Sequence, residues 1–412
     1  MNCAFLEGLS LSTLVAPVTA EEFRTKYFER QPLIVNRRNP DYYDNLFTLE
    51  EFDAAMARTP EYVKVTNAVT NKTNQYRLAD IRGAEAMLSD MRDGSTLVLD
   101  QLQKSDPKLG ELCRVLSAQL GPRFQTNLYL TPPNGKGFTP HYDNHDVFIL
   151  QVVGSKHWSV EKHRRRLPGR DESIPDAERE LRGELYKFVL EQGDIVYIPR
   201  GFVHAAECAA EPSLHITLGL LPFCWDELMV AVTKAAALKN EQLRYALPLG
   251  FQQEKRELFV NQLKAAFRAM TDPVFLEGAI QQYMDEIISH YPLDIAGHVR
   301  DFFAPRPVRL DDVLVLRRGI TFRAHLDGEA PRVNYGGRTI TFLEIFRDAL
   351  GRALDGAAFA VRDLPGDLHD DERIAFAERL LQEGLLVHQA GAEADVNRHR
   401  RRALEESPAA AE

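Results

Sequence analysis

The sequence predicts an α+β protein built around a double-stranded β-helix, the jelly-roll barrel found in cupins. In residues 124–221 the apolar residues recur with a period of two, and Gly- and Pro-containing turns separate the segments. So many short antiparallel strands favour a closed or sandwiched double sheet. Before and after this region the apolar spacing is helical.

These changes of pattern divide the chain of 412 residues into five expected regions. They are an N-terminal α/β region (1–123), the barrel core (124–222), a helical segment of the dimerisation type (223–300), a winged-helix-like domain (308–390) and a disordered tail (391–412). The length by itself suits two to three domains.

Composition narrows the class of protein. A hydrophobic fraction of 44% and a charged fraction of 27% are typical of a soluble globular chain. The net charge of -10 disfavours nucleic acid as a partner and favours a basic one, although many cytosolic proteins are mildly acidic. The four cysteines lack paired spacing, which indicates reduced thiols and a cytoplasmic location. We expect no signal peptide in the first 20 residues and no membrane span.

The N-terminal region is expected to alternate helices and short strands. Thr19 precedes an amphipathic segment rich in early acids, which predicts a capped helix. Further helices are expected at 49–58, 83–91 and 107–120, with a strand at 31–36 and short polar strands within 61–100.

Seven strands are expected in the core. They are 124–130, 147–153, 156–161, 186–190, 194–198, 202–208 and 213–221. The charged stretch 164–183 interrupts them and reads as a solvated excursion.

Helical spacing returns at 226–240, 254–270 and 273–291. Such helices often mediate dimerisation, but they can equally pack on the barrel. After a linker at 298–307, strands are expected at 313–316, 320–324 and 385–388 and helices at 341–353 and 370–383. The basic run 398–402 lies in the tail, where a solvated segment is favoured over a nucleic-acid contact.

One histidine and one aspartate stand out in the core. His141 and Asp143 are two positions apart, so on a strand they share a face. His204, which follows a Pro-Arg-Gly turn, is the best candidate for a third ligand. Two histidines and a carboxylate with open positions opposite suit non-haem Fe(II) chemistry. A hydrogen-bonded pair on a surface strand is the alternative for the first two residues.

Several motifs extend this pattern over about a hundred residues. They are Asn127-x-Tyr129, His141-x-Asp143, the run from Asp146 to Trp158, Gly193-Asp194 with Pro199-Arg-Gly-Phe-Val-His204, and Ser213 to Leu218. Residues 125–221 thereby resemble the JmjC/cupin ribosomal oxygenases, which are Fe(II)- and 2-oxoglutarate-dependent protein hydroxylases. The order of the helical segment and the winged-helix-like end also resembles that family.

The resemblance implies roles for individual residues. His141, Asp143 and His204 would hold Fe(II), and no catalytic residue beyond these ligands is expected. Lys156 stands where the family places the cation for the distal carboxylate of 2-oxoglutarate, although an exposed hairpin lysine is the plainer alternative. Strand parity puts Asn127 with Tyr129, and His215 with Thr217, as cosubstrate-pocket residues; the alternative for Tyr129 and His215 is a role in the core.

The sequence also departs from the family. Relatives can carry a hydroxyl side chain four residues beyond the position of His215, where this chain has Gly219. His145 has the parity of a fourth ligand, but we expect it at the rim because a closed site would impede oxygen activation. His157 and Trp158 are expected to pack in the barrel.

The implied reaction uses O2 to hydroxylate an arginine or histidine side chain of a protein or peptide, ribosomal proteins included, and releases succinate and CO2. A peptide-tailoring hydroxylase or a demethylase would share this chemistry. A non-catalytic cupin binding module and a DNA-binding regulator are the rivals from other classes. The expected partners are a basic protein substrate and a second copy of the chain, without a membrane.

Overall fold

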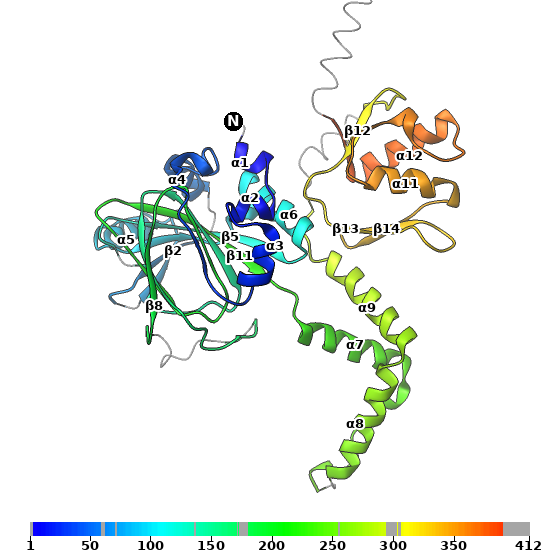
Figure 1. Ribbon diagram of the computed structural model, residues 1–412, viewed down its shortest axis with the longest axis horizontal. Coiled ribbons are helices and arrows are strands. Elements are labelled where there is room, and N and C mark those ends of the chain that lie inside the picture. The colour runs from blue at the N-terminus through cyan, green and yellow to red at the C-terminus, as the bar shows by residue number, and fades with distance from the viewer. Residues whose placement is uncertain are drawn as a thin grey trace, which may run out of the picture. The chain divides into compact units, whose positions relative to one another are not determined.

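The computed structural model describes residues 3–58, 62–70, 72–135, 137–170, 172, 180–253, 256–293, 303 and 306–389. The chain forms two compact units that divide between Phe223 and Cys224 (Figure 1). The first unit combines the predicted N-terminal region with the barrel, and the second contains the helical segment and the C-terminal elements. The finer division into five regions remains a prediction.

A sheet of eight strands forms the framework of the first unit, in the order β1-β9-β6-β11-β5-β4-β2-β3. The strands are β1 (Leu33–Val35), β2 (Val63–Asn67), β3 (Lys72–Tyr76), β4 (Thr96–Leu99), β5 (Arg123–Thr131), β6 (Asp146–Val153), β9 (Ile195–Ile198) and β11 (Ser213–Leu221). All of their pairings are antiparallel, as the alternating pattern predicts.

A second sheet, ordered β10-β7-β8, consists of β7 (Lys156–Glu161), β8 (Leu185–Leu190) and β10 (His204–Cys208). Ile149 of β6 packs in one apolar cluster with Trp158 and Leu190 of this second sheet. The two sheets therefore face each other and make the predicted double-sheet barrel. The predicted strand at 202–208 starts two residues too early, because Phe202 still belongs to the turn, where its N–H donates to the carbonyl of Pro199.

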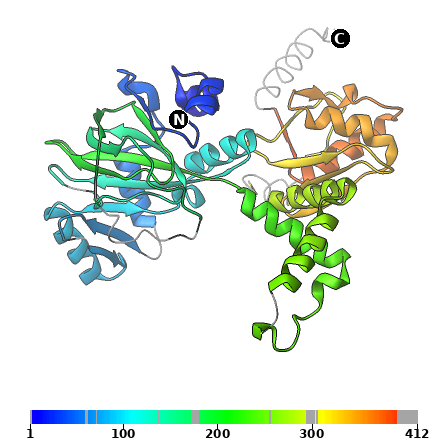
Figure 2. The same cartoon turned by 60° about the horizontal axis from the view of Figure 1, so that its bottom comes forward.

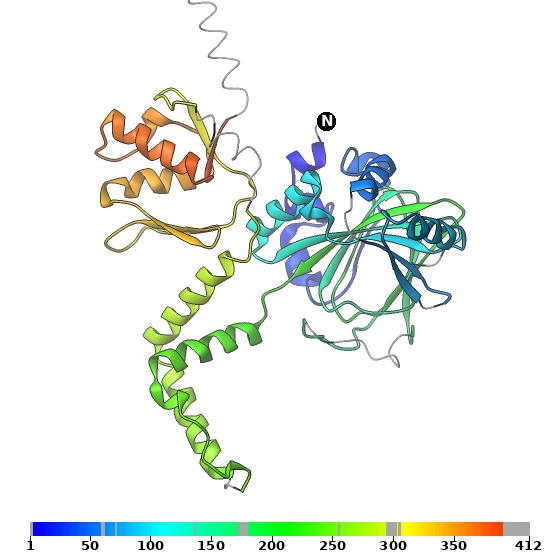
Figure 3. The same cartoon turned by 180° about the vertical axis from the view of Figure 1, so that it is seen from behind.

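The other face of the large sheet is covered by N-terminal helices. Phe148 and Leu150 of β6 belong to a core cluster that also contains Leu14, Phe23 and Leu116. Both faces of β6 are thus buried, which explains its continuous apolar run. The helices are α1 (Ala4–Glu7), α2 (Leu11–Val15), α3 (Ala20–Glu22), α4 (Leu49–Arg58), α5 (Ile81–Arg92) and α6 (Pro107–Leu120). Figure 3 shows α1 and α2 beside α6.

Most of these helices follow the predicted ranges. Thr19 caps α3, since its hydroxyl accepts a hydrogen bond from the N–H of Glu22 (3.0 Å). The segment then continues as a π-helical turn, Phe23–Tyr27. Helices α1 and α2 were not predicted, because they span only four and five residues and offer little periodicity.

Asp194 ties the N-terminal strand β1 to the barrel. Its buried carboxylate accepts hydrogen bonds from the backbone N–H of Arg37 (2.7 Å), the side-chain amide of Asn36 (2.8 Å) and the N–H of Glu191 (3.0 Å). The Gly193-Asp194 motif therefore has a structural task at the start of β9.

The second unit begins with three helices, α7 (Trp225–Lys239), α8 (Arg256–Met270) and α9 (Pro273–Ile288). Their ends lie close to the predicted ones, except that α9 ends three residues early. Pro292 follows it, and the residue before a proline is disfavoured in helical conformation.

Among the described residues of this unit, two three-stranded sheets and the helices α11 and α12 follow (Figure 2). The sheets are β16-β12-β17 and β13-β14-β15. The elements are β12 (Val313–Leu316), β13 (Phe322–His325), β14 (Arg332–Tyr335), β15 (Arg338–Thr341), α11 (Arg347–Leu354), β16 (Phe359–Ala360), α12 (Asp370–Gln382) and β17 (Leu386–His388).

Here the sequence prediction was partly wrong. The helix expected from Thr341 starts at Arg347, because Thr341 ends β15. Strands β14, β15 and β16 were not predicted. The Gly336-Gly337 pair, with φ of 58° and 76°, forms the two-residue turn between β14 and β15, and such a glycine pair is a sequence signal for a hairpin.

Some predicted features lie outside the described residues. These are the tail 391–412 with its basic run, most of the linker 298–307 and part of the excursion 164–183. Over the part of the chain that the structure describes, no helix combines the length and apolar character needed to cross a bilayer.

Candidate metal centre

A short backbone pairing brings His141 and His204 together. The N–H of His141 donates to the carbonyl of His204 (3.1 Å), and the N–H of His204 donates to the carbonyl of His141 (2.8 Å). This isolated antiparallel bridge places the two imidazole rings side by side, with centroids 4.5 Å apart. Two residues from distant parts of the sequence thus face the barrel interior from neighbouring segments.

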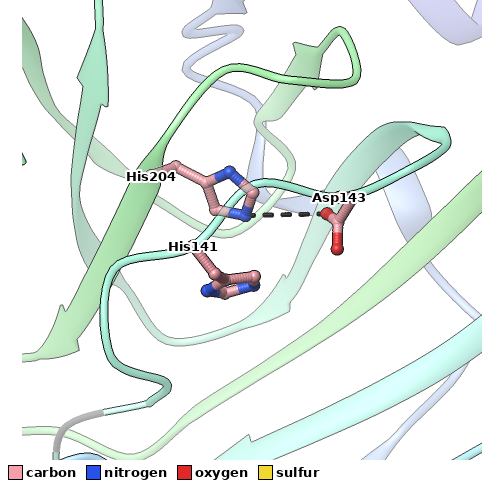
Figure 4. Close-up of side chains that lie close together, drawn as sticks. All are labelled: His141, Asp143 and His204. Carbon is pink, nitrogen blue, oxygen red and sulfur yellow. Dashed lines mark ion pairs between the residues drawn. The ribbon is translucent and has the colours of Figure 1, made fainter. Parts of the chain in front are cut away.

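Asp143 completes the cluster. Its carboxylate oxygen Oδ2 lies 3.7 Å from Nε2 of His204 (Figure 4). The ligand atoms of His141, Asp143 and His204 all lie within 4.8 Å of one another. One cation placed between them could be bound by two imidazole nitrogens and one carboxylate oxygen, the donor set of non-haem iron sites. The structure therefore brings together the three residues that were selected from the sequence.

Both histidines are oriented by backbone carbonyls. Nδ1 of His141 is 2.8 Å from the carbonyl oxygen of Thr139, and Nδ1 of His204 is 3.0 Å from that of Phe202. A carbonyl can only accept, so each Nδ1 donates a proton and Nε2 is the nitrogen that faces a metal. Such contacts fix the tautomer and the ring direction of a metal ligand.

Burial sets the charge states of the cluster. Burial, and then the nearby imidazole of His141, lower the pKa of His204 to about 4, so this ring is neutral at pH 7. Burial alone would raise the pKa of Asp143, but His204, His141 and His145 outweigh it and the pKa is lowered. A neutral imidazole and an ionised carboxylate are the forms that bind metal.

Asp146 holds the turn that leads to His204. Its carboxylate accepts hydrogen bonds from the N–H of Arg200 (2.8 Å) and from the hydroxyl of Tyr197 (3.1 Å), and burial raises its pKa to about 6. The next N–H, that of Gly201, donates to the carbonyl of Asp143 (3.1 Å). These contacts fasten the two ligand-bearing segments to each other. The sequence pattern assigned Asp146 no role of its own.

Lys156 is buried, contrary to the exposed alternative, with only 2% of its surface accessible. Its ammonium group donates to the hydroxyl of Thr131 (2.8 Å), and burial lowers its pKa to about 8. None of the described residues pairs a carboxylate with it. A buried cation without a counter-ion is costly, so the site fits a ligand that carries its own carboxylate.

The predicted pocket residues face one another across two strands. In the pairing of β5 with β11, Tyr129 is opposite His215 and Asn127 is opposite Thr217. The rings of Tyr129 and His215 stack at 5.0 Å with an angle of 9°. Asn127 accepts a hydrogen bond from the N–H of Gln101 (2.9 Å). Their shared face is confirmed, while their binding role remains a prediction.

Gly219 makes room for His145. A Cβ atom at this position would lie 2.7 Å from Nε2 of His145. The imidazole thus occupies the space that a side chain on β11 would need, and it is not part of the three-residue cluster found among the described residues. His145 accordingly lies beside the centre, as expected of a rim residue, and the missing hydroxyl at Gly219 has a steric reason.

The two aromatic residues after Lys156 behave differently. Trp158 is buried in the cluster between the sheets, as expected, whereas His157 is exposed. Alternation along β7 explains the error for His157, because neighbouring side chains point to opposite faces.

Comparison with known proteins agrees with this geometry. Residues 99–228 match the JmjC domain. The chain is 28% identical to the bifunctional lysine-specific demethylase and histidyl-hydroxylase NO66 of Aedes aegypti, over 91% of this chain and 66% of that protein. It is 31% identical to ribosomal oxygenase 1 of Gallus gallus, over 65% of this chain and 49% of that protein. The chain thus spans between about half and two thirds of the length of these curated relatives.

Solved structures show the same fold. The X-ray structure of E. coli ycfD superposes with a TM-score of 0.59 and 18% identity, covering 90% of this chain and 98% of that one. The structure of YcfD, a ribosomal oxygenase from E. coli, with cobalt and 2-oxoglutarate has a TM-score of 0.54 and 17% identity, with 91% and 99% covered. The chain therefore has the JmjC cupin fold, carries a JmjC domain at residues 99–228 and is similar to the ribosomal oxygenases.

Proposed function

We propose that this protein is an Fe(II)- and 2-oxoglutarate-dependent oxygenase that hydroxylates an arginine or histidine side chain of a protein. The observation that carries the proposal is the presence, in one barrel, of the cluster His141, Asp143 and His204 together with a buried lysine that has no counter-ion among the described residues. The cobalt and 2-oxoglutarate found in the YcfD structure support the same pair of cofactors.

In this proposal His141 and His204 bind iron through Nε2 and Asp143 through its carboxylate. When bound, iron and 2-oxoglutarate supply the oxidative chemistry: one atom of O2 enters a C–H bond of the substrate, the other enters succinate, and CO2 leaves. Three protein ligands leave positions for the cosubstrate and O2. The chain's own contribution is to orient the ligand side chains and to hold the imidazole of His204 neutral.

Lys156 is proposed to pair with the distal carboxylate of 2-oxoglutarate. Tyr129 and His215 would line the same pocket as a stacked pair, and Asn127 and Thr217 would continue that face along the two strands. A charge-assisted hydrogen bond in a buried pocket is stronger than one in water.

A basic protein is the proposed substrate. The net charge of -10 favours encounter with a positively charged partner over a nucleic acid. Two relatives carry the names ribosomal oxygenase and histidyl-hydroxylase, which supports a ribosomal protein with a basic target side chain.

We further propose that the chain forms a homodimer through α7, α8 and α9. These helices expose many large apolar side chains: Met229, Val230 and Leu238 on α7, Leu258, Val260, Leu263 and Phe267 on α8, and Val274 and Met284 on α9. Apolar surface of this extent usually marks an interface.

We also propose a type for the C-terminal domain and a cellular compartment. The C-terminal helices α11 and α12, with their small sheets, support a winged-helix-like domain at 308–390. All four cysteines are free thiols, which supports a reducing, cytoplasmic compartment.

The reaction can be tested on ribosomal proteins. Incubated with these, Fe(II) and 2-oxoglutarate, the purified protein should release succinate, and mass spectrometry should show that one basic ribosomal protein gains the mass of one oxygen atom. His141→Ala should abolish both signals. Loss of a methyl group instead would identify a demethylase. No succinate, with or without ribosomal proteins, would reject the oxygenase and favour a binding module.

The metal centre can be tested by Mn(II) binding. His141→Ala should weaken this binding by at least about tenfold, because it removes one of three ligands. His145→Ala, a change of the same size beside the cluster, should leave the affinity unchanged. Titration followed by electron paramagnetic resonance of free Mn(II) measures both. Equal losses in the two variants would contradict the three-residue centre.

The charge of Lys156 should make cosubstrate binding depend on pH. In the ligand-free protein the pKa of Lys156 is about 8, so the ammonium form predominates below that pH and meets the carboxylate directly. Above pH 8, binding must take up a proton, so the affinity for 2-oxoglutarate should fall by up to about tenfold per pH unit. Calorimetry of the Mn(II)-loaded protein from pH 7 to 9.5 tests this. Lys156→Met should bind weakly at every pH without this slope; a sloping profile in that variant would exclude Lys156 as the cause.

The dimer should depend on the apolar side chains of α8. Leu263→Asp combined with Phe267→Asp should convert the protein to a monomer, because charges would be buried in the interface. Leu88→Asp, at an exposed position on α5 in the other unit, is the control and should leave the mass unchanged. Sedimentation equilibrium gives the masses. A wild-type monomer at all concentrations would disprove the proposed dimer.

A further inference from the structure

Trp158 carries a buried hydrogen-bond donor that has no partner among the described residues. The side chain is 6% accessible, and no described residue accepts a hydrogen bond from its indole Nε1. Indole N–H is donor only, and buried donors in proteins are nearly always paired. A phenylalanine would fill this part of the barrel without leaving a donor unpaired, so packing alone does not account for the tryptophan.

The location of Trp158 indicates what the donor is for. It shares the inner face of β7 with Lys156, two residues away. Its ring centroid lies 6.0 Å from that of His204 and 5.8 Å from that of His215. Trp158 therefore lies beside the stretch between the metal centre and the buried ammonium group.

A second buried nitrogen without a described partner lies next to it. This is Nδ1 of His215, a residue that is 3% accessible. The pKa of His215 is lowered well below its usual value, first by burial and then by the charge of Lys156, so the ring is neutral and close to that ammonium group. Two donors and a neutral imidazole close to one another match a ligand rich in acceptor oxygens, such as a dicarboxylate.

We propose that Trp158 is a cosubstrate-binding residue, which donates its indole N–H to a carboxylate oxygen of bound 2-oxoglutarate. This inference rests on the proposed function. Trp158 would then bind the cosubstrate in addition to packing between the two sheets.

The two tryptophans of the chain allow a matched test, since Trp225 is exposed and lies in the other unit. In the Mn(II)-loaded protein, Trp158→Phe should weaken 2-oxoglutarate binding by about 10- to 100-fold, the effect expected for losing a hydrogen bond to a charged group. Trp225→Phe should bind like the wild type. Calorimetry measures the dissociation constants, and Mn(II) affinity checks that the metal centre is intact.

A direct reading of the hydrogen bond does not depend on how Trp158→Phe folds. Trp225→Phe leaves a single indole, whose N–H can be followed by ¹⁵N-resolved nuclear magnetic resonance in the protein loaded with diamagnetic Zn(II). Addition of 2-oxoglutarate should move the indole proton downfield and slow its exchange with solvent. An unmoved indole signal under saturating ligand would overturn the inference.

The outcomes separate the inference from the proposed function. Failure of the wild type to bind 2-oxoglutarate would reject the function itself. Binding by the wild type that Trp158→Phe retains in full would leave the function standing and reduce Trp158 to a packing residue.

Discussion

The metal centre depends on one backbone interaction, the paired hydrogen bonds between His141 and His204. Each residue supplies both a ligand and half of the bridge that positions the other. His141 lies outside the named strands while His204 begins β10, and neighbouring contacts help to hold the bridge. The N–H of Gly201 on the carbonyl of Asp143, and the N–H of Arg200 on the carboxylate of Asp146, fasten the same two segments. Ligand geometry is thereby fixed mainly by backbone groups, which move less than long side chains.

The barrel interior gives this geometry its chemical character. Burial keeps the imidazole of His204 neutral at pH 7. Lys156 is also buried, and none of the described residues places a carboxylate beside it. Proteins rarely bury a cation or an indole N–H in this way, because each unpaired group opposes folding. Buried polar groups without a protein partner occur most often at functional sites, where a bound ligand can supply the missing hydrogen bond or charge. The apolar cluster between the two sheets stabilises the barrel and offsets the free energy lost by burying these unpaired groups.

The second unit follows a different principle. Its helices α7 and α9 share a small cluster around Val232, Ala235 and Ala279, while larger apolar side chains remain exposed. The C-terminal elements, by contrast, enclose a continuous core that includes Leu314 and Phe376. These exposed apolar side chains are the basis of the proposed dimer.

The barrel could be predicted from the residues alone, because a period of two along each strand is a local property. Strands 156–161 and 213–221 were predicted residue for residue, and parity alone placed Asn127 with Tyr129 on one strand and His215 with Thr217 on another. The three candidate ligands could also be predicted, because the residue type and the position after the Pro-Arg-Gly turn selected His204 as the partner of His141 and Asp143. The strands β14 and β15 were missed because their polar residues carry a weaker pattern, although their glycine pair was visible.

The burial and charge state of individual side chains could be read only from the folded chain. Three features depend on neighbours far away in the chain. They are the burial of Lys156, the close approach of His145 to Gly219, and the rings that surround Trp158. Periodicity states which face a residue occupies, but it carries no information about what lies opposite. Partners, burial and charge state follow from that opposite face, and they exist only once the two sheets have closed.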